Sequence, residues 1–444
     1  MANINPGHTG LQESEAIAPR VGPPPDTVRA DVGQPASERT PARVEGHRRF
    51  DVGFWLAAAA FLVAMAFSTM PSPLYVLYER RDAFSSFMVT VVFGVYAVGV
   101  VASLLLTGHI SDWIGRRRVL IPALGIEVLA AVLFLVWPSL PGLIVARVIS
   151  GFGIGMITST ATAYLRDLQA RSRPGSGQGR FEMVSTAANI GGLGVGTLVS
   201  GFLAQFVPAP LVVPYVVFAV LMVLAVGGLV LAPETVAPPA IRPRYRPQGI
   251  AISGDRASWL VAAVGAFAAF AVFGVFTALA PGFVAVDLGH SSRLLAGVVT
   301  FITFGAAALA QATTGRLPNR SRMLLGSLAE AIGLVLATVG MYDTNLAAFL
   351  LGGGVAGAGA GVLFKSALAI LLGSAEPAKR GEASAGLFVV AYVALVIPVL
   401  GIGIATLSVS SQLAMLVFAA ALLVVLALLA TLAARTLRTP RAIR

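Results

Sequence analysis

"GHISDWIGRRRV", residues 108–119, is a dense polar stretch between two long apolar runs. Its glycines, Gly108 and Gly115, permit a tight turn and close backbone approach. Its arginines at 116–118 would hold the start of the next run on the positively charged side of a membrane. Asp112 is the unusual member, because a carboxylate at the C-terminal end of a helix opposes the helix dipole and needs hydrogen-bond donors. Two interpretations stay open: a topological anchor with a charge-balancing aspartate, or a latch between helices that opens and closes.

The composition around this stretch is that of a membrane protein. Hydrophobic residues make up 57% of the 444 residues and charged residues 11%, with a mean hydropathy of +0.85, whereas soluble domains carry about 25% charged residues. Apolar runs of about 18 residues or more can cross a bilayer as helices. Twelve such runs are present, at 54–71, 87–108, 118–137, 141–164, 182–206, 211–231, 258–280, 294–315, 322–342, 346–372, 382–406 and 411–434. The sequence therefore predicts an all-α integral membrane protein with twelve transmembrane helices in contact with the lipid bilayer.

The polar segments divide the chain into five parts. Residues 1–50 are polar, Pro-rich and mixed in charge, which predicts a disordered cytoplasmic tail and not a signal peptide. A segment rich in Pro and Arg at 233–257 predicts a cytoplasmic linker. We expect a six-helix bundle at 51–232, a second at 258–434, and a cytoplasmic tail at 435–444.

The distribution of basic residues predicts the orientation in the membrane. Most of the 31 Lys and Arg residues lie in the tails, the linker and the loops of one side, whereas the loops of the other side hold Arg80, Arg81 and Arg293. Basic residues collect on the cytoplasmic side. We therefore expect a multi-pass protein of the cell (inner) membrane with both termini in the cytoplasm. The formal net charge of +11 is then a topology signal and does not indicate nucleic-acid binding.

The two predicted bundles share sequence features in the same order, which favours an internal repeat. The paired features are Arg180-Phe181-Glu182 with Arg380-Gly381-Glu382, the glycines Gly151, Gly153 and Gly155 with Gly357, Gly359 and Gly361, and Glu127 with Glu330. Each pair alone has little weight in a chain with 48 glycines. Their common order predicts two pseudo-symmetric bundles of six helices.

The opening stretch carries a family resemblance. Residues 108–117 resemble the Gly-x-Leu-(Ala/Ser)-Asp-Arg-x-Gly-Arg-(Arg/Lys) signature of the major facilitator superfamily (MFS), and the resemblance covers residues of about 50 to 435. It implies the MFS fold and a secondary transporter that moves a small-molecule substrate. Gly196 and Gly201 are similar to part of a signature of the drug:proton antiporter-type members, although Thr197 stands at the usual proline.

The resemblance implies a gating latch. Its residues would be Gly108, Asp112, Gly115, Arg116 and Arg117. In the family the aspartate pairs with the start of the eleventh helix in the outward-facing state, so Asp112 would meet the backbone near 382–385. Trp113 stands where the family usually has Arg, and Asn319 stands where the second half would have Asp. We therefore expect an asymmetric latch.

Four charged residues fall inside the predicted helices, where a charge usually marks a pathway or a partner. Arg147 and Lys365 are candidates for the substrate cavity, and Glu127, Arg147 and Glu330 are candidates for proton coupling. Counting about 1.5 Å per residue from the cytoplasmic helix ends, Glu330 and Lys365 both lie about 12 Å deep and could pair. By the same count Glu127 lies about 14 Å deep and Arg147 about 28 Å, too far apart for contact. A carboxyl without a basic partner favours its protonated form, as a proton carrier requires. The alternatives are a snorkelling Arg147 and a neutral, hydrogen-bonded Glu127.

We expect efflux of a small amphiphilic compound or drug by proton antiport, with uptake of an organic acid or sugar by proton symport as the alternative. The run 54–71 contains no acid, which argues against a strictly cationic substrate. The sequence shows no ATP-binding motif, no catalytic nucleophile–base pair, no metal site and no need for a cofactor. We therefore expect no enzyme, a monomer, and no nucleic-acid partner. A receptor built on the same fold differs only in that no compound would cross the membrane.

Overall fold

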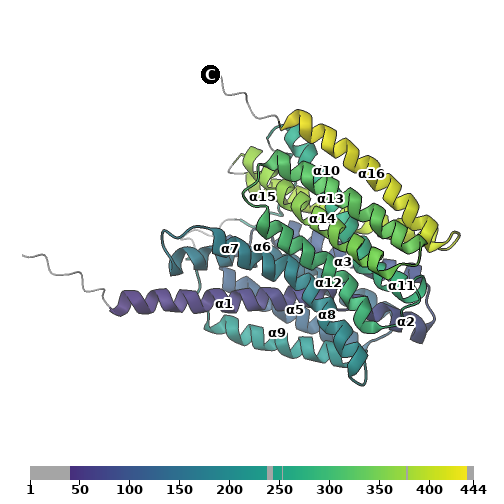
Figure 1. Ribbon diagram of the computed structural model, residues 1–444. Helices are drawn as coiled ribbons and strands as arrows, with labels where there is room; N and C mark the ends of the chain where they lie inside the picture. Colours follow the sequence, from purple (N-terminus) through teal and green to yellow (C-terminus); the bar gives the residue numbers. More distant parts are fainter. Residues whose placement is uncertain (1–40, 238–243, 253, 377–378, 438–444) are drawn as a thin grey trace, which may run out of the picture. The chain divides into compact units, whose positions relative to one another are not determined.

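The computed structural model describes residues 41–237, 244–252, 254–376 and 379–437 (Figure 1). From Ala42 onwards the chain forms one compact unit. Within the described ranges all regular secondary structure is helical, and twelve helices are long and apolar enough to cross a membrane. The predicted all-helical architecture with twelve spans is confirmed.

The first half of the chain supplies six of these spans, two of them built from consecutive shorter segments. Its elements are α1 (Pro41–Thr69), the 3-10 turn η1 (Ser72–Leu74), α2 (Tyr75–Asp82), α3 (Ser86–Thr107), α4 (Ser111–Ile114), α5 (Arg116–Val136), α6 (Leu140–Ser172), α7 (Gly179–Thr186), the π-helical segment η2 (Ala187–Gly191), α8 (Gly192–Phe206) and α9 (Val213–Leu231).

The second half supplies the other six spans. Its elements are α10 (Arg256–Ala278), α11 (Ala280–Val286), α12 (Arg293–Thr313), α13 (Asn319–Tyr342), α14 (Leu346–Ser374), α15 (Arg380–Ala405) and α16 (Ser411–Thr436). We call the end of the bundle where α3 meets α5 the linker end, and the end where α5 meets α6 the distal end.

Two helices are longer than their apolar runs. The first begins at Pro41, so residues 41–50 of the predicted disordered tail are helical. The other, α6, continues to Ser172 instead of ending near residue 164. Its last turns bury Leu165 and Leu168 and expose Arg166, an amphipathic pattern that a search for apolar runs does not detect. The remainder of the predicted tails, residues 1–40 and 438–444, lies outside the described residues.

The two halves meet along two helix pairs, α3 with α15 and α8 with α12. Counted by spans, these are the second with the eleventh and the fifth with the eighth. When each span is replaced by its counterpart in the other half, the second becomes the eighth and the eleventh becomes the fifth. One pair is thereby converted into the other. The arrangement therefore has the internal pseudo-symmetry expected from the repeated features.

Burial separates central helices from peripheral ones. Of an 18-residue apolar stretch of α10, 78% is buried inside the protein, whereas the corresponding share in α9 is 28%. The exposed side chains of α9 are apolar and include Val216, Val220, Val223, Leu224 and Leu231. An apolar exposed face is what a helix needs where it borders lipid.

Candidate functional site

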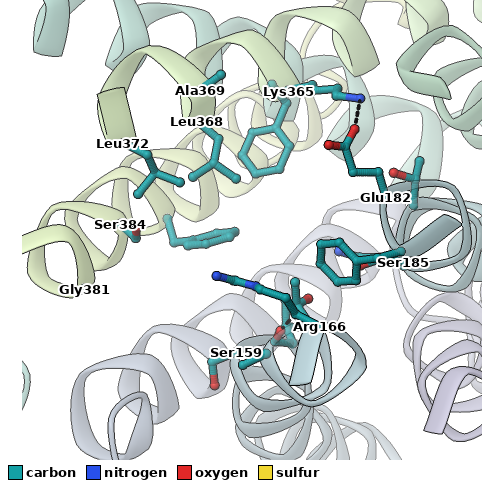
Figure 2. Close-up of a pocket in the computed structure, with 18 of the residues that line it drawn as sticks. Ser159, Arg166, Glu182, Ser185, Lys365, Leu368, Ala369, Leu372, Gly381 and Ser384 are labelled. Atoms are coloured by element: carbon teal, nitrogen blue, oxygen red, sulfur yellow. Dashed lines mark hydrogen bonds and ion pairs between the residues drawn. The ribbon is translucent and has the colours of Figure 1, made fainter. Parts of the chain in front are cut away.

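A cavity of about 800 Å³ lies between the two halves at the linker end (Figure 2). We call it the vestibule. Ser159, Arg166 and Glu182 line it from the first half, and Lys365 and Ser384 line it from the second. Both halves contribute charged and hydroxyl side chains, so the vestibule is a polar cavity at the end predicted to be cytoplasmic.

A second, smaller cavity of about 70 Å³ lies deeper between the halves. We call it the aromatic site because eight aromatic side chains line it: Phe93, Tyr96, Phe270, Phe273, Phe304, Phe364, Phe388 and Tyr392. The two cavities adjoin, because they share five lining residues: Thr158, Asn189, Ile190, Phe364 and Phe388. The vestibule therefore leads to an apolar inner site.

The aromatic rings pack against one another in the second half. Phe270 meets Phe364 edge to face with centroids 4.9 Å apart, and Phe273 stacks on Phe304 at 4.8 Å. The Tyr392 ring lies 5.7 Å from Phe270. Flat surfaces of this kind accept planar apolar groups. Sequence reasoning missed the site, because each of these residues lies inside a long apolar run.

Arg147 on α6 borders the aromatic site, and its side chain is 1% exposed. Its Nη1 donates to the Ser68 carbonyl at 2.7 Å, and its guanidinium lies 4.3 Å from the centre of the Tyr96 ring. Its Nε has no hydrogen-bond partner, and no carboxylate in the described chain forms an ion pair with it. Arg147 is therefore not a snorkelling residue. It is a buried cation with a spare donor beside an apolar cavity.

Glu127 on α5 is completely buried against α6. Its Oε2 accepts a hydrogen bond from Ser150 Oγ at 2.9 Å, and its Oε1 has no partner. At Gly153 a β-carbon would lie 2.2 Å from Oε1, so only glycine leaves room for the carboxyl. The hydroxyl contact agrees with the hydrogen-bonded interpretation, and the free oxygen leaves a place for a proton.

Glu127 and Arg147 lie at similar heights, and the large separation inferred from the sequence is wrong. Counted from the distal turn that joins α5 to α6, Glu127 lies nine residues before Val136 and Arg147 lies seven after Leu140. At about 1.5 Å per residue the two differ in height by about 3 Å. The earlier count began at the linker end, where α6 extends well beyond α5. Ser150, which donates to Glu127, lies one helical turn from Arg147 on α6, so Arg147 is near Glu127 although the two form no ion pair.

Glu330 and Lys365, which could have paired by their depth, do not pair. Glu330 is completely buried on α13, and neither carboxyl oxygen has a hydrogen-bond partner. Lys365 Nζ lies 3.6 Å from a carboxylate oxygen of Glu182 and donates to the Gln311 carbonyl at 2.9 Å (Figure 2). Equal depth did not bring Glu330 and Lys365 together, because the Lys365 side chain points into the vestibule.

The predicted latch residues form a network within the first half. Arg116 Nη1 lies 2.5 Å from Asp112 Oδ1, and its Nε lies 3.3 Å from Asp167 Oδ2. Asp112 is 62% exposed and makes no hydrogen bond to residues 382–385. The vestibule separates the halves at this end, so the latch contact implied by the resemblance remains a prediction for the opposite state.

Glu234, in the "APET" stretch at 232–235, completes this network. Its carboxylate accepts hydrogen bonds from the backbone N–H groups of Arg116 at 2.9 Å and Arg117 at 3.1 Å, at the N-terminus of α5. Gly115 precedes them with φ 121° and lies against the same carboxylate. A carboxylate at a helix N-terminus satisfies free donors and complements the dipole. Sequence reasoning missed this role, because Glu234 lies far along the chain from the residues that it caps.

Residues 244–252 of the linker cross from one half to the other, and we call them the strap. The Tyr245 hydroxyl donates to the Leu106 carbonyl at 3.0 Å, and Gln248 N–H donates to the Leu105 carbonyl at 2.7 Å. On the other side, Ala251 N–H lies 3.5 Å from the Glu382 carbonyl. The strap therefore joins the end of α3 to the start of α15 along the vestibule.

The fifth span carries the candidate antiporter residues. A β-carbon at Gly196 would lie 1.8 Å from the Ala66 carbonyl, so this glycine is needed where α8 meets α1. Gly201 lies against Gly297 of α12 in the other half, and Thr197 Oγ1 donates to the Gly297 carbonyl at 3.2 Å. Thr197 and Gly201 therefore form the close contact between α8 and α12, and Gly196 forms the one between α8 and α1.

Three comparisons with known proteins agree with this architecture. Residues 56–332 match the family described as Major Facilitator Superfamily. The arabinose-proton symporter of Bacillus subtilis (strain 168) is 32% identical over 83 residues, which are 19% of this chain and 18% of that relative. The match thus spans less than a fifth of the relative's length.

Solved structures share the fold at low identity. The nucleoside transporter NupG, in a mutant form, aligns with a TM-score of 0.67 at 12% identity and covers 86% of this chain and 99% of its own. The human organic anion transporter MFSD10 (TETRAN) aligns with a TM-score of 0.61 at 17% identity and the same coverage. With its twelve spans and the family match over more than half of its length, the chain belongs to the major facilitator superfamily and is a membrane transporter rather than an enzyme.

Proposed function

We propose that the protein carries a small amphiphilic organic acid together with a proton, by alternating access through the aromatic site. The observation that carries this proposal is Arg147, a buried cation with a free Nε beside an aromatic cavity. A guanidinium presents planar donors that match a carboxylate, and aromatic walls match the apolar part of the same molecule.

Proton coupling follows from the neighbouring charge of Glu127. When Glu127 is protonated, the Arg147 charge is uncompensated and attracts an anion. When Glu127 loses its proton, its carboxylate offsets that charge and weakens anion binding, because electrostatic effects are strong in a dry interior. Proton and anion therefore favour each other's binding, which is the requirement for symport.

This reasoning changes the order of the two modes inferred from the sequence. Antiport requires the proton and the substrate to exclude each other, and the charges at Arg147 and Glu127 make them cooperate. Symport with an inward proton gradient gives uptake. Since one proton and one monocarboxylate together carry no net charge, transport responds to the pH gradient and not to the membrane potential.

Efflux by proton antiport is the second candidate, with a neutral amphiphilic compound as substrate. The resemblance of Gly196 and Gly201 to part of the antiporter-type signature supports it, and both glycines lie at close helix contacts, with Ala66 and with Gly297. One proton exchanged for a neutral molecule moves one charge, so this mode responds to the membrane potential as well. The two candidates therefore differ in a measurable property.

The test is uptake of radiolabelled phenylacetate into right-side-out membrane vesicles, with the pH gradient and the membrane potential imposed separately. We expect accumulation when the outside is acidic, and no response to a potassium diffusion potential. Arg147→Gln should lower kcat/KM by about ten- to a hundredfold, because a charged hydrogen bond contributes about 1.5–3 kcal/mol. Glu127→Gln should remove the pH dependence.

Arg171→Gln is the matched control, because Arg171 lies on the same helix, is exposed and lines neither cavity. It should leave transport near the wild-type rate. Absence of gradient-driven uptake for phenylacetate and for other aromatic acids, together with potential-dependent export of neutral amphiphiles from everted vesicles, would establish the second candidate instead.

A further inference from the structure

Few polar groups at the aromatic site are free to bind a ligand. Three hydroxyls that line it already donate to backbone carbonyls: Ser68 to Met65 at 2.7 Å, Thr69 to Leu193 at 2.6 Å, and Thr277 to Phe273 at 2.6 Å. A hydroxyl has one hydrogen to donate, so these groups offer a substrate no further donor. Thr158 Oγ1 donates to Met65 Sδ at 3.8 Å, and the Tyr96 hydroxyl is hydrogen-bonded to Ser68. What remains is the Nε of Arg147, the Tyr392 hydroxyl and the side-chain amide of Asn189.

These free groups lie at two different places. Arg147 and Tyr392 line the aromatic site and not the vestibule. Asn189 lines both cavities and therefore lies where one opens into the other. Its side-chain amide makes no hydrogen bond within the described chain, whereas its backbone carbonyl accepts one from Gly192, and the residue is half-buried. Between the two places the lining is mostly phenylalanine.

The backbone at Asn189 is unusual. The residue lies in η2, the π-helical segment Ala187–Gly191 that interrupts the fifth span. A π-helical turn adds a residue to the helix and changes the direction of the side chains that follow, and such turns recur at functional sites. The chain here accepts a less common helix geometry and presents an amide at the mouth of an apolar site.

The inner cavity, at about 70 Å³, is too small for a whole aromatic molecule such as benzene, which occupies an engineered cavity of about 150 Å³ in another protein. A substrate whose carboxylate reaches Arg147 must therefore extend past Phe364 and Phe388 into the vestibule. Its far end then passes Asn189. A polar group at that end would find an amide able both to donate and to accept.

We propose that Asn189 is a specificity-determining residue, and that it selects planar aromatic carboxylates with a second hydrogen-bonding group at the end remote from the carboxylate. The proposal rests on the proposed function for the role of Arg147 and adds the class of substrate. It assigns charge recognition to Arg147 and recognition of the remote polar group to Asn189.

The experiment compares 4-hydroxyphenylacetate with phenylacetate in the vesicle assay at a fixed inward pH gradient. The two acids differ only in the remote hydroxyl. Wild-type protein should show the higher kcat/KM for 4-hydroxyphenylacetate. Asn189→Leu, which keeps the volume and removes the hydrogen-bonding groups, should reduce that preference by about three- to tenfold, the value of one neutral hydrogen bond.

The loss should appear in KM for 4-hydroxyphenylacetate, with the maximal rate and the phenylacetate kinetics close to wild type. Asn189→Gln keeps an amide and should restore part of the preference. Ala187→Ser is the matched control, because Ala187 belongs to the same π-helical segment but is exposed and lines neither cavity. It should leave the preference unchanged.

The outcomes separate this inference from the proposed function. If both acids are carried and Asn189→Leu keeps the wild-type preference, the role of Asn189 is refuted and the function stands. If Asn189→Leu slows both acids equally, the residue is structural and the inference is again refuted. If the wild-type protein carries neither acid, the proposed function fails and the inference fails with it.

Discussion

The two ends of the transporter hold its halves together by different means. At the linker end the halves are separated by the vestibule of about 800 Å³, and the polar contacts across it include the Lys365–Glu182 pair and the strap, residues 244–252. At the distal end the cavity between the halves measures only about 90 Å³. There α8 and α12 touch at the level of their backbones, through Gly201 and Gly297.

This difference indicates at which end the contacts between the halves are easier to break and re-form. Exposed ion pairs contribute little, about 0–1 kcal/mol each, and are readily exchanged with water. Close helix packing through glycines buries backbone against backbone and tolerates no added atom. The structure therefore represents a state that is open at the linker end and locked at the distal end. The chain contains no cysteine, so a single introduced cysteine reports each end without background.

The largest effect should come from breaking the distal lock. A β-carbon at Gly297 would lie 2.3 Å from the Thr197 carbonyl, so Gly297→Val should hold the distal end apart and reduce transport by at least about tenfold. Labelling of Thr406→Cys, in the distal cavity, should become faster. Gly305→Val is the control on the same helix, because nothing lies near its β-carbon. Equal transport by the two variants would show that the glycine contact is not the lock.

A smaller effect should follow from Glu234→Ala, which removes the cap of α5 within the first half. The variant leaves two backbone donors without their carboxylate, so the free energy of unfolding should fall by about 1–3 kcal/mol. Thermal unfolding in detergent measures this change. Glu376→Ala, in an exposed pair with Lys379, should leave the midpoint almost unchanged. A similar midpoint for both variants would contradict the assigned role of Glu234.

The strap tests how weakly the linker end is held. Gln248→Pro removes the N–H that donates to Leu105, and should reduce the open population at this end by about two- to tenfold. Labelling of Ser159→Cys in the vestibule should slow accordingly. Arg246→Pro changes the strap at an N–H that makes no hydrogen bond in the described chain, and is the control. Faster labelling in Gln248→Pro would mean that the strap obstructs the vestibule and does not hold it open.

The smallest effect concerns pH at the distal end. Half-burial raises the pKa of Asp287, and a hydrogen bond from Ser411 offsets part of the rise. A raised pKa means that the closed state favours the protonated acid, so closure is most stable at low pH and weakens as pH rises through that pKa. Thr406→Cys labelling, normalised to a free thiol, should therefore increase up to a few fold between about pH 4 and pH 7. Asp287→Asn should flatten the profile, and an unchanged profile would assign the titration to another group.

Much of the architecture was predictable because a bilayer imposes a simple rule on sequence. Every span must be a helix with about 20 apolar residues, so run length alone located twelve spans to within a few residues, except at α1 and α6. Asp112 and Arg116 were predictable as members of a polar network, because charged residues at a helix turn are rare in so apolar a chain, whereas Asp167 was not. Their partner Glu234 was missed because it is more than a hundred residues away.

Of the residues at the candidate functional site, only the charged ones could be identified from the sequence. Arg147 and Glu127 stood out in the sequence because a charge inside an apolar run is costly. Their similar height in the membrane could not be read from the sequence. It depends on where α6 ends at the linker end and on the turn that joins α5 to α6. The aromatic site was not predictable at all, because phenylalanine is an ordinary residue in a membrane helix.

The amino-acid sequence by itself determined the number of spans, the division into two related halves and the polar residues that stand out from an apolar background, because each of these follows from the cost of placing polar groups in lipid. Only the tertiary structure decided which face of each helix meets which neighbour. That choice depends on packing between residues far apart in the chain, such as Phe270 with Phe364, Thr197 with Gly297 and Lys365 with Glu182. Hydropathy is a property of single residues, whereas a binding site is a property of surfaces brought together.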